Sequence, residues 1–584
     1  MKFIKISLLL SIPFIFATAC MSTSDDSSIK PKPYNIAPLK ERAPKPTASL
    51  HRPFDFQLSL SGNFGELRSN HFHGGIDFKT QGTVGHPIHC ADDGYVSQIS
   101  VSGGGYGRAI YVTHPTTGLT TVYGHLDGFA PNISEIIVAK QYELETFAIT
   151  MRFTPDKLPV KKGDIIAFSG NSGYSFGPHL HMEVRHTDTG DALDPLPYFK
   201  DLIADNVAPS SQVLALYPHK DDGRINGAKK AAYTNTVPGV ASNFSAWGKV
   251  YPAIRANDYM SNSNNIYGIK HLALKVDGKE VYRRTIDRFR MVATRAINTL
   301  VDYNDLLNTG NWNMYTHIPS SKPLGCMIES NSDDGAININ EQRAYNCEFI
   351  MTDEYGNSST VPFIIYGYKT NIEASAPSQG KLIKLNSIDT ITSGGLSLKF
   401  YEGAFYDNTH VDVKQQESGA FYSPIYSIGE TSIPIARAFR IAIKLDNDTL
   451  SDKSKYCIAQ VNGKHKSPVY SRYKNGEMIG YVSRFGDYTV TTDLTAPTIT
   501  PINEYKWSSY GSITFAISDN FSGIKNYRGT IDGKWVMFEA DNKNSLVTFK
   551  LTPDKVNKGG THEVSLCVTD NCGNTTSKTH KFVW

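Results

Sequence analysis

Short segments in which apolar and polar residues alternate recur along the 584-residue chain, and turn residues separate them. Residues 94–101 alternate with period two, and a glycine-rich run joins them to a second such segment at 109–114. This period is typical of strands with one buried face. No strong amphipathic helical pattern stands out between residues 51 and 206. Three further strands are predicted in the first domain, at 120–123, 164–169 and 179–185. The pattern as a whole predicts an all-β fold, with a compact β-sheet domain followed by two or three β-sandwich modules.

An internal repeat in the second half of the chain indicates two related modules. Gly-Ile-Lys at 268–270 is followed by Asp-Gly-Lys at 277–279, and the same residues recur at the same spacing at 523–525 and 532–534. Such Asp-Gly steps favour tight hairpins. Each copy ends in Thr-Asp-x-x-Gly-Asn, which resembles the final turns of bacterial immunoglobulin-like domains. Aspartates in these turns could bind calcium, but turn chemistry explains them without a metal; they are Asp258, Asp353, Asp519 and Asp570.

Ala-Pro steps at 208–209, 376–377 and 496–497 mark the joints between modules. We read two related sandwiches near 209–370 and 497–584. The expected organisation is a signal peptide at 1–20, a flexible tether at 21–50, a first domain at 51–206, a second module (a β-sandwich) at 207–375, a β-rich middle module at 376–494, and a last module (an immunoglobulin-like β-sandwich) at 495–584.

The first twenty residues look like a targeting signal. Lys2 and Lys5 precede an apolar run at 6–16 that is too short to span a bilayer comfortably. The following Ala-Thr-Ala-Cys resembles a bacterial lipobox, in which Cys20 would be lipidated. Ala17 stands where Leu or Val is usual, so plain secretion is the alternative. We therefore expect an exported protein of the cell envelope, facing the periplasm or the cell surface and attached to a membrane through Cys20. Residues 21–50 are rich in Ser, Asp, Lys and Pro, a composition typical of a tether.

Two separated stretches supply histidines and a carboxylate at spacings that suit a mononuclear zinc site with an open position. In Asn-His-Phe-His-Gly-Gly-Ile-Asp, His73 and Asp77 are four residues apart, and the two glycines let the backbone bend between them. His179 and His181 are two residues apart in a predicted strand, so both rings leave the same face. One of them can bind the metal while the other lies beside it. His125, at the end of another predicted strand, could join them.

Three motifs in this order resemble the lysostaphin-type, or LytM-like, zinc metallopeptidases over residues 55–200. They are Asn-His-Phe-His-Gly-Gly-Ile-Asp, Tyr-Gly-His-Leu, and Ser-Gly-Asn-Ser-Gly-Tyr-Ser-Phe-Gly-Pro-His-Leu-His-Met-Glu. The resemblance implies that His73, Asp77 and His181 bind Zn²⁺ and that His179 and His125 are catalytic. It implies metal-assisted hydrolysis, with His179 as general base and His125 orienting the water or stabilising the oxyanion. At each of these five positions, this sequence has the residue type that the family motif has.

One departure from the family is an insertion at 133–159, where an added flap could narrow or gate the substrate groove. Six cysteines besides Cys20 are present, and their pairing cannot be read from spacing. No Cys-x-x-Cys occurs, which argues against a thiolate zinc site. The net charge of +3 is small for this length and gives no reason to expect a nucleic-acid partner.

The leading hypothesis is an exported zinc metalloendopeptidase that hydrolyses peptide cross-links of cell-wall peptidoglycan. The family cuts D-alanyl–diaminopimelate bonds and glycine bridges, and the lipoprotein-like start favours the former. A second hypothesis is an envelope-binding, adhesin or hydrolase-activating lipoprotein. In it the first domain recognises wall peptides without cutting them, and the C-terminal modules bind a protein or glycan partner. A third is an endopeptidase acting on exported proteins or bacteriocins.

Overall fold

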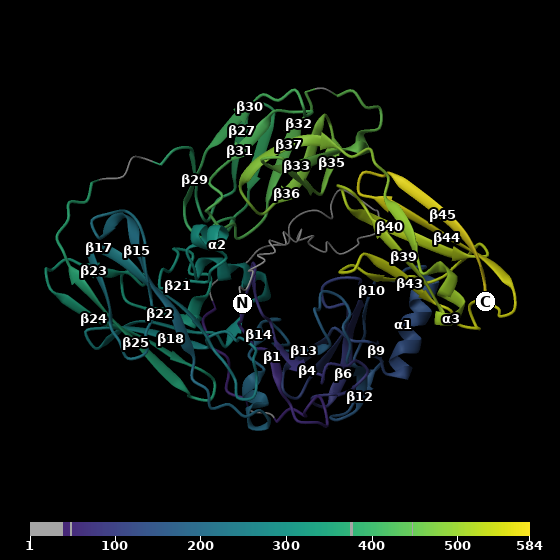
Figure 1. Cartoon of the computed structure of the whole chain (residues 1–584), viewed down its shortest axis with the longest axis horizontal. Helices are drawn as coiled ribbons and strands as arrows, with labels where there is room; N and C mark the ends of the chain where they lie inside the picture. Colours follow the sequence, from purple (N-terminus) through teal and green to yellow (C-terminus); the bar gives the residue numbers. More distant parts are fainter. Residues whose placement is uncertain (1–38, 47–48, 374–377, 447) are drawn as a thin grey trace, which may run out of the picture.

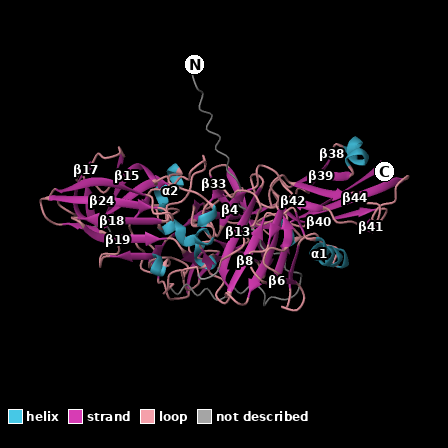
Figure 2. Cartoon of the chain, turned by 90° about the horizontal axis from the view of Figure 1, so that it is seen from below, coloured by secondary structure: helices cyan, strands magenta, loops and turns pink. Residues whose placement is uncertain are grey.

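A computed structural model of the chain describes residues 39–46, 49–373, 378–446 and 448–584. Strands make up 46% of the chain and helices 9%, so the expected all-β fold is confirmed, as Figure 2 shows. The expected signal peptide, which ends at Cys20, lies outside the described residues. Within the described ranges, no helix is long and apolar enough to cross a membrane.

The first domain is built on an antiparallel sheet with strand order β1-β4-β13-β8-β7-β6-β10. A smaller sheet, β5-β12-β9, accompanies it. The strands predicted at 94–101, 109–114, 120–123, 164–169 and 179–185 are all present. The elements are β1 (Leu60–Gly62), β2 (Leu67–Arg68), β3 (His71–Phe72), β4 (Ile76–Lys79), β5 (Pro87–His89), β6 (Gly94–Val101), β7 (Arg108–His114), β8 (Leu119–Gly124), β9 (Gly128–Phe129), α1 (Pro131–Glu143), β10 (Ile149–Arg152), β11 (Pro159–Val160), β12 (Ile165–Phe168), β13 (His179–His186), β14 (Ala192–Leu193) and the short 3₁₀ helices η1 (Leu196–Tyr198) and η2 (Lys200–Leu202).

The insertion at 133–159 does not form a flap over the predicted zinc site, and it contains a helix that the sequence pattern did not predict. It supplies most of α1 as well as β10, which pairs with β6 at the far edge of the sheet. Strands β6, β7 and β8 separate β10 from β13. The helix buries Ile133, Ile137 and Gln141 at four-residue spacing, but exposed Ile136 and Leu144 blur its apolar stripe.

The second module is hydrogen-bonded into a single ten-stranded sheet, in which the long strand β17 pairs with β15, β21, β23 and β25. Its β20 leaves that sheet and pairs with β14 of the first domain, and Phe289 of β20 lies in the first domain's core. The elements are β15 (Ser210–Ile225), β16 (Ala232–Asn235), β17 (Ser242–Asn257), β18 (His271–Val276), β19 (Lys279–Thr285), β20 (Arg288–Phe289), η3 (Met291–Thr299), α2 (Tyr303–Thr309), β21 (Met314–Tyr315), η4 (Gly325–Met327), β22 (Ile328–Ser330), β23 (Ile337–Ile339), β24 (Ala344–Thr352) and β25 (Ser358–Gly367).

The middle module contains two five-stranded sheets and a separate strand pair. Its core includes the buried side chains of Phe400, Phe439 and Tyr456. The elements are β26 (Lys381–Ile383), β27 (Asp389–Ser393), β28 (Leu396–Phe400), β29 (Thr409–Val411), β30 (Val413–Gln416), β31 (Ile425–Ile428), β32 (Phe439–Lys444), η5 (Lys453–Lys455), β33 (Tyr456–Asn462), β34 (His465–Val469), β35 (Ser471–Lys474), β36 (Glu477–Val482) and β37 (Gly486–Thr492).

The last module has two four-stranded sheets around buried Trp507 and Phe515. The elements are β38 (Thr498–Ile502), η6 (Glu504–Lys506), α3 (Trp507–Tyr510), β39 (Ser512–Ser518), β40 (Ile524–Ile531), β41 (Lys534–Trp535), β42 (Glu539–Asp541), β43 (Leu546–Lys550), β44 (Thr561–Asp570) and β45 (Thr575–Val583). The repeated Asp-Gly steps form the expected hairpin turns, β18–β19 and β40–β41, and both residues of each step have positive φ.

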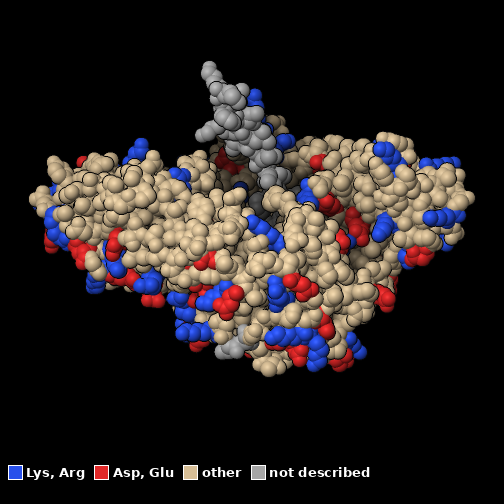
Figure 3. Space-filling view, turned by 60° about the horizontal axis from the view of Figure 1, so that its bottom comes forward, with Lys and Arg blue, Asp and Glu red and all other residues tan. Residues whose placement is uncertain are grey.

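The modules follow one another around the first domain in Figure 1, from teal through green to yellow, and the last module lies beside α1 and β10. On the face shown in Figure 3, acidic and basic side chains are interspersed. The described end of the expected tether contacts the folded chain. The Leu39 carbonyl accepts a hydrogen bond from the Cys326 N–H, and Arg42 pairs with Asp287 at 2.8 Å.

Candidate metal centre

His73, Asp77 and His181 bring three potential donor atoms together in the first domain. Oδ1 of Asp77 lies 3.0 Å from Nε2 of His73 and 2.9 Å from Nδ1 of His181, and the two nitrogens are 2.9 Å apart. All three side chains are buried. Strand register explains part of this arrangement, because Asp77 of β4 lies directly opposite His181 of β13.

Two glycines carry the chain from His73 to β4. A Cβ added to Gly75 would lie 2.2 Å from the carbonyl oxygen of Met182, so only glycine allows β4 to approach β13 this closely. A Cβ on Gly74 would meet nothing closer than Oε1 of Glu183, at 3.2 Å. The requirement for glycine is therefore strict at position 75 and weaker at position 74.

The outer nitrogens of both candidate ligand histidines donate to nearby acceptors. Nδ1 of His73 donates to the Asn63 carbonyl at 2.7 Å, and Nε2 of His181 donates to Oε1 of Glu183 at 3.0 Å. These bonds leave Nε2 of His73 and Nδ1 of His181 with lone pairs directed at a carboxylate oxygen. Three such atoms repel one another unless a proton or a cation lies between them. Their separations are slightly below the ~3.3 Å edge of a tetrahedron with ~2.05 Å zinc–nitrogen bonds, so the residues fit a zinc ion.

Burial and the neighbouring charges set the protonation of this cluster. Burial lowers the pKa of His73 to about 4. Burial also disfavours the charged form of His181, but hydrogen bonds to Asp77 and Glu183 raise its pKa to about 9. Burial would raise the pKa of Asp77, yet His73 and His181 hold it well below its usual value. A metal ion would displace the proton that His181 otherwise keeps.

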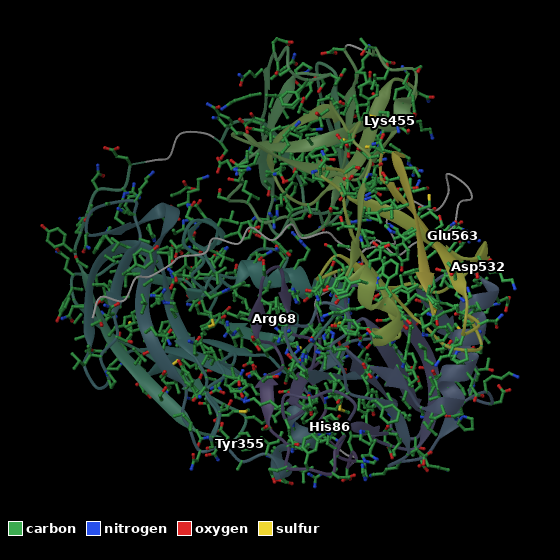
Figure 4. The ribbon with its side chains drawn as sticks, turned by 45° about the vertical axis from the view of Figure 1, so that its right-hand side comes forward. Arg68, His86, Tyr355, Lys455, Asp532 and Glu563 are labelled. Atoms are coloured by element: carbon green, nitrogen blue, oxygen red, sulfur yellow. The ribbon has the colours of Figure 1, made fainter. Side chains whose placement is uncertain are left out.

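Four charged or polar side chains around the ligands were not predicted from the sequence. Glu183 is fully buried and accepts hydrogen bonds from Tyr106 and Arg185 as well as His181. Arg68, labelled in Figure 4, donates to Oδ2 of Asp77 at 2.8 Å and leaves Oδ1 facing the histidines. Glu183 could have been found, because it follows His181 on β13 at the same two-residue spacing that separates His179 from His181. Arg68 and Tyr106 come from other segments, and no spacing indicates them.

The two predicted catalytic histidines lie next to the cluster. Nδ1 of His179 donates to the Gly177 carbonyl at 2.9 Å, and its Nε2 is 3.6 Å from Oδ1 of Asp77. Nδ1 of His125 donates to the Ser172 carbonyl at 2.8 Å, and its ring centroid is 4.8 Å from that of His179. Burial lowers the pKa of both rings, that of His125 to about 3. Both are therefore neutral near pH 7, with Nε2 as an unprotonated acceptor.

The last module contacts the loops that border this centre. The Asn542 N–H donates to the Gly103 carbonyl at 3.0 Å, and Arg108 pairs with Glu539 at 2.6 Å. Lys543 donates to the Asn171 carbonyl, one residue before the Ser172 carbonyl that holds His125. The last module thus supports the loop that positions His125.

Comparisons with known proteins give partial matches. A family model described as a Zu5-like domain matches residues 380–493. The chain is 36% identical over 125 residues to an uncharacterized metalloprotease of Haemophilus influenzae, and 31% identical over 153 residues to the DD-carboxypeptidase/endopeptidase Mpg of Neisseria meningitidis. These alignments cover 21% and 26% of this chain and only 20% and 26% of the two relatives. The catalytic domain of the antimicrobial peptidase lysostaphin from Staphylococcus simulans is 24% identical, with 24% of this chain and 89% of that chain covered and a TM-score of 0.18.

Proposed function

We propose that this chain, which carries a lysostaphin-type, LytM-like peptidase domain, is an exported zinc metalloendopeptidase that hydrolyses peptide cross-links of peptidoglycan. The observation that carries the proposal is the convergence of His73, Asp77 and His181 within 3.0 Å, with two further neutral histidines beside them. The names of the relatives, a metalloprotease and a carboxypeptidase/endopeptidase, support the same class of reaction.

In the proposed mechanism His73, Asp77 and His181 would hold the zinc ion. Zinc bound in such a site polarises the scissile carbonyl and lowers the pKa of water. Nε2 of His179 accepts the proton of the attacking water, because its Nδ1–H is engaged by Gly177 and its lone pair faces the centre. Nε2 of His125, whose Nδ1–H is engaged by Ser172, accepts a hydrogen bond and orients the water. In this neutral tautomer His125 has no proton to donate to an oxyanion, which favours the orienting role.

We also propose that the chain works in the cell envelope, anchored through lipidated Cys20. The basic start, the apolar run at 6–16 and the lipobox-like Ala-Thr-Ala-Cys support this location. A Cys20→Ser variant should leave the membrane fraction while remaining exported. If wild type and variant fractionate alike, Cys20 is not the anchor.

The proposed activity is tested with protein that starts after Cys20 and with purified cross-linked sacculi, in the presence and absence of a chelator. Mass analysis of the released muropeptides identifies the bond that is cut. We expect cross-linked dimers to give monomers by cleavage of the D-alanyl–diaminopimelate bond, with activity lost on chelation and restored by zinc. Intact cross-links in the presence of bound zinc would favour the binding or hydrolase-activating alternative.

A further inference from the structure

Two clusters of three aspartates lie at the joints that precede the second and the last module. The first cluster contains Asp205, Asp258 and Asp353, and each residue offers a carboxylate oxygen within 4.8 Å of the other two. The second contains Asp493, Asp519 and Asp570, whose carboxylate oxygens also lie within 4.8 Å of one another. Neither cluster belongs to the zinc centre or to the peptidase mechanism.

The first aspartate of each cluster lies in the linker before its module. Asp205 precedes Pro209 by four residues, and Asp493 precedes Pro497 by four residues. A carboxylate oxygen of Asp205 accepts the Ser261 N–H at 3.0 Å, and one of Asp493 accepts the Ser522 N–H at 2.9 Å. The equivalent serine of each repeat copy therefore donates its N–H to the linker aspartate.

The other two aspartates also occupy equivalent places. Asp258 follows β17 and Asp519 follows β39, each three residues before that serine. Oδ1 of Asp353 accepts the N–H groups two and four residues ahead of it, and Oδ1 of Asp570 does the same. The amides of Asn357 and Asn574 then donate to the carbonyls of Asp205 and Asp493. The same set of backbone and carboxylate contacts therefore occurs at both joints.

The clusters are left with unsatisfied buried oxygens. Asp258 is only 3% exposed, and its buried Oδ1 has no hydrogen-bond partner among the described residues. Within the same ranges, Oδ2 of Asp205 and Oδ1 of Asp519 are also buried without a partner. A cavity of about 10 Å³ lies beside Asp258 and Asp353. An unpaired buried carboxylate oxygen is costly, so these atoms indicate a site for a cation.

The charges around Asp258 support the same conclusion. The carboxylates of Asp205 and Asp353 lie close to that of Asp258. Lys270, which lines the same cavity, is engaged by Asp194 and Glu354. In the part of the chain that the structure describes, no lysine or arginine forms an ion pair with these three carboxylates.

We propose that each cluster binds one Ca²⁺ ion. Calcium takes oxygen ligands at ~2.4 Å, so two oxygens bound to one ion lie at most ~4.8 Å apart, and the carboxylate oxygens of each cluster lie within that distance of one another. The absence of histidine and cysteine from both donor sets disfavours zinc. Because each ion would join a linker aspartate to two loops of the following module, calcium fixes both joints. Tyr355 and Lys455, labelled in Figure 4, lie at the first and the second joint.

The test uses the zinc-loaded chain that starts after Cys20. Calcium is titrated into it, and binding is measured by calorimetry and by Tb³⁺ luminescence. We expect two calcium ions per chain, with affinities in the ~10⁻⁴–10⁻³ M range of extracellular modules. Asp258→Asn and Asp519→Asn should each reduce the stoichiometry from two to one, and the double variant should bind none. Exposed Asp221→Asn and Asp554→Asn are matched controls that should still bind two.

Two further measurements keep the test decisive. His73→Ala, which removes a proposed zinc ligand, should leave calcium binding unchanged, so failure of the peptidase proposal would not affect this result. Circular dichroism shows whether each variant is folded, and the wild-type stoichiometry stands even if a variant unfolds. A folded wild-type chain that binds no calcium at ~10 mM, well above that range, would overturn the proposal. Preferential binding of Mg²⁺ would overturn the assignment to calcium.

Discussion

Oε1 of Glu183 lies 3.0 Å from Nε2 of His181, and no part of the Glu183 side chain is exposed. With its Nε2–H engaged by this carboxylate, His181 would present Nδ1 to the proposed metal ion. Arg185 and His181 overcome the opposing effect of burial and lower the pKa of Glu183 to about 2, so it is charged near neutral pH.

Glu183→Gln should weaken zinc binding by ~10–100-fold, the usual cost of losing a carboxylate behind a histidine ligand. Competition with a chromophoric chelator measures the change, and excess zinc should restore much of the activity. Unchanged affinity for zinc in this variant would show that Glu183 does not orient His181.

Substitutions of the adjacent glycines should have unequal effects. The Gly75→Ala methyl group would lie 2.2 Å from the Met182 carbonyl, and overpacking of this kind costs ~1–3 kcal/mol. The nearest atom to a Gly74→Ala methyl group is Oε1 of Glu183, at 3.2 Å, which is a much smaller overlap. We expect Gly75→Ala to lose zinc and Gly74→Ala to keep most of it, as measured by metal content. Equal zinc contents would contradict this account of the β4–β13 approach.

The contact between the last module and α1 should depend more on one aromatic pair than on an exposed ion pair. Tyr142 of α1 meets Trp535 edge to face at 5.1 Å, and the Lys555 ammonium lies 4.1 Å from the Tyr142 ring centroid. The Glu145–Arg528 pair is about half exposed, and such pairs contribute ~0–1 kcal/mol. Trp535→Ala should therefore increase hydrogen exchange in α1 more than Arg528→Ala does. The opposite order would show that charge holds this interface.

Cysteine pairing can be tested across the joint between the middle and last modules. The six cysteines of the described residues are free, but the thiol of Cys457 lies beside that of Cys572, and this contact raises the pKa of Cys457 well above its usual value. Mild oxidation with diamide should join these two residues, although Cys567 is the nearest cysteine to Cys572 in sequence. Peptide mapping without reduction would identify the bond. A Cys567–Cys572 product would contradict the structure.

Five strands of the first domain are predicted from the sequence because strand-forming residues and the turn residues between them are local signals. Period-two alternation in residues 94–101 and Asp-Gly turns at 277–278 and 532–533 are local signals that tertiary packing does not override. The helix at 131–143 was missed because its apolar face is incomplete. Its position at the far edge of the sheet depends on pairing between β10 and β6, which no local pattern encodes.

The same contrast holds for the site. His73, Asp77, His179 and His181 form motifs, so their residue types and spacing alone indicate a metal. Arg68 and Tyr106 reach the centre only through folding, and the last module reaches Asn171 from more than 350 residues away in sequence. The aspartate clusters are only partly predictable from the sequence. Their turns are visible in the sequence, but the linker residues Asp205 and Asp493 join them only in three dimensions.

The central claim is that His181 binds the metal while His179 acts beside it. The most direct test measures zinc content and muropeptide release in the same samples of wild type, His179→Ala and His181→Ala. We expect His179→Ala to retain zinc and to lose activity by ~10²–10⁴-fold, the range for loss of a general base. His181→Ala should lose both zinc and activity. Full cleavage by zinc-loaded His179→Ala, or full zinc occupancy in His181→Ala, would contradict the account.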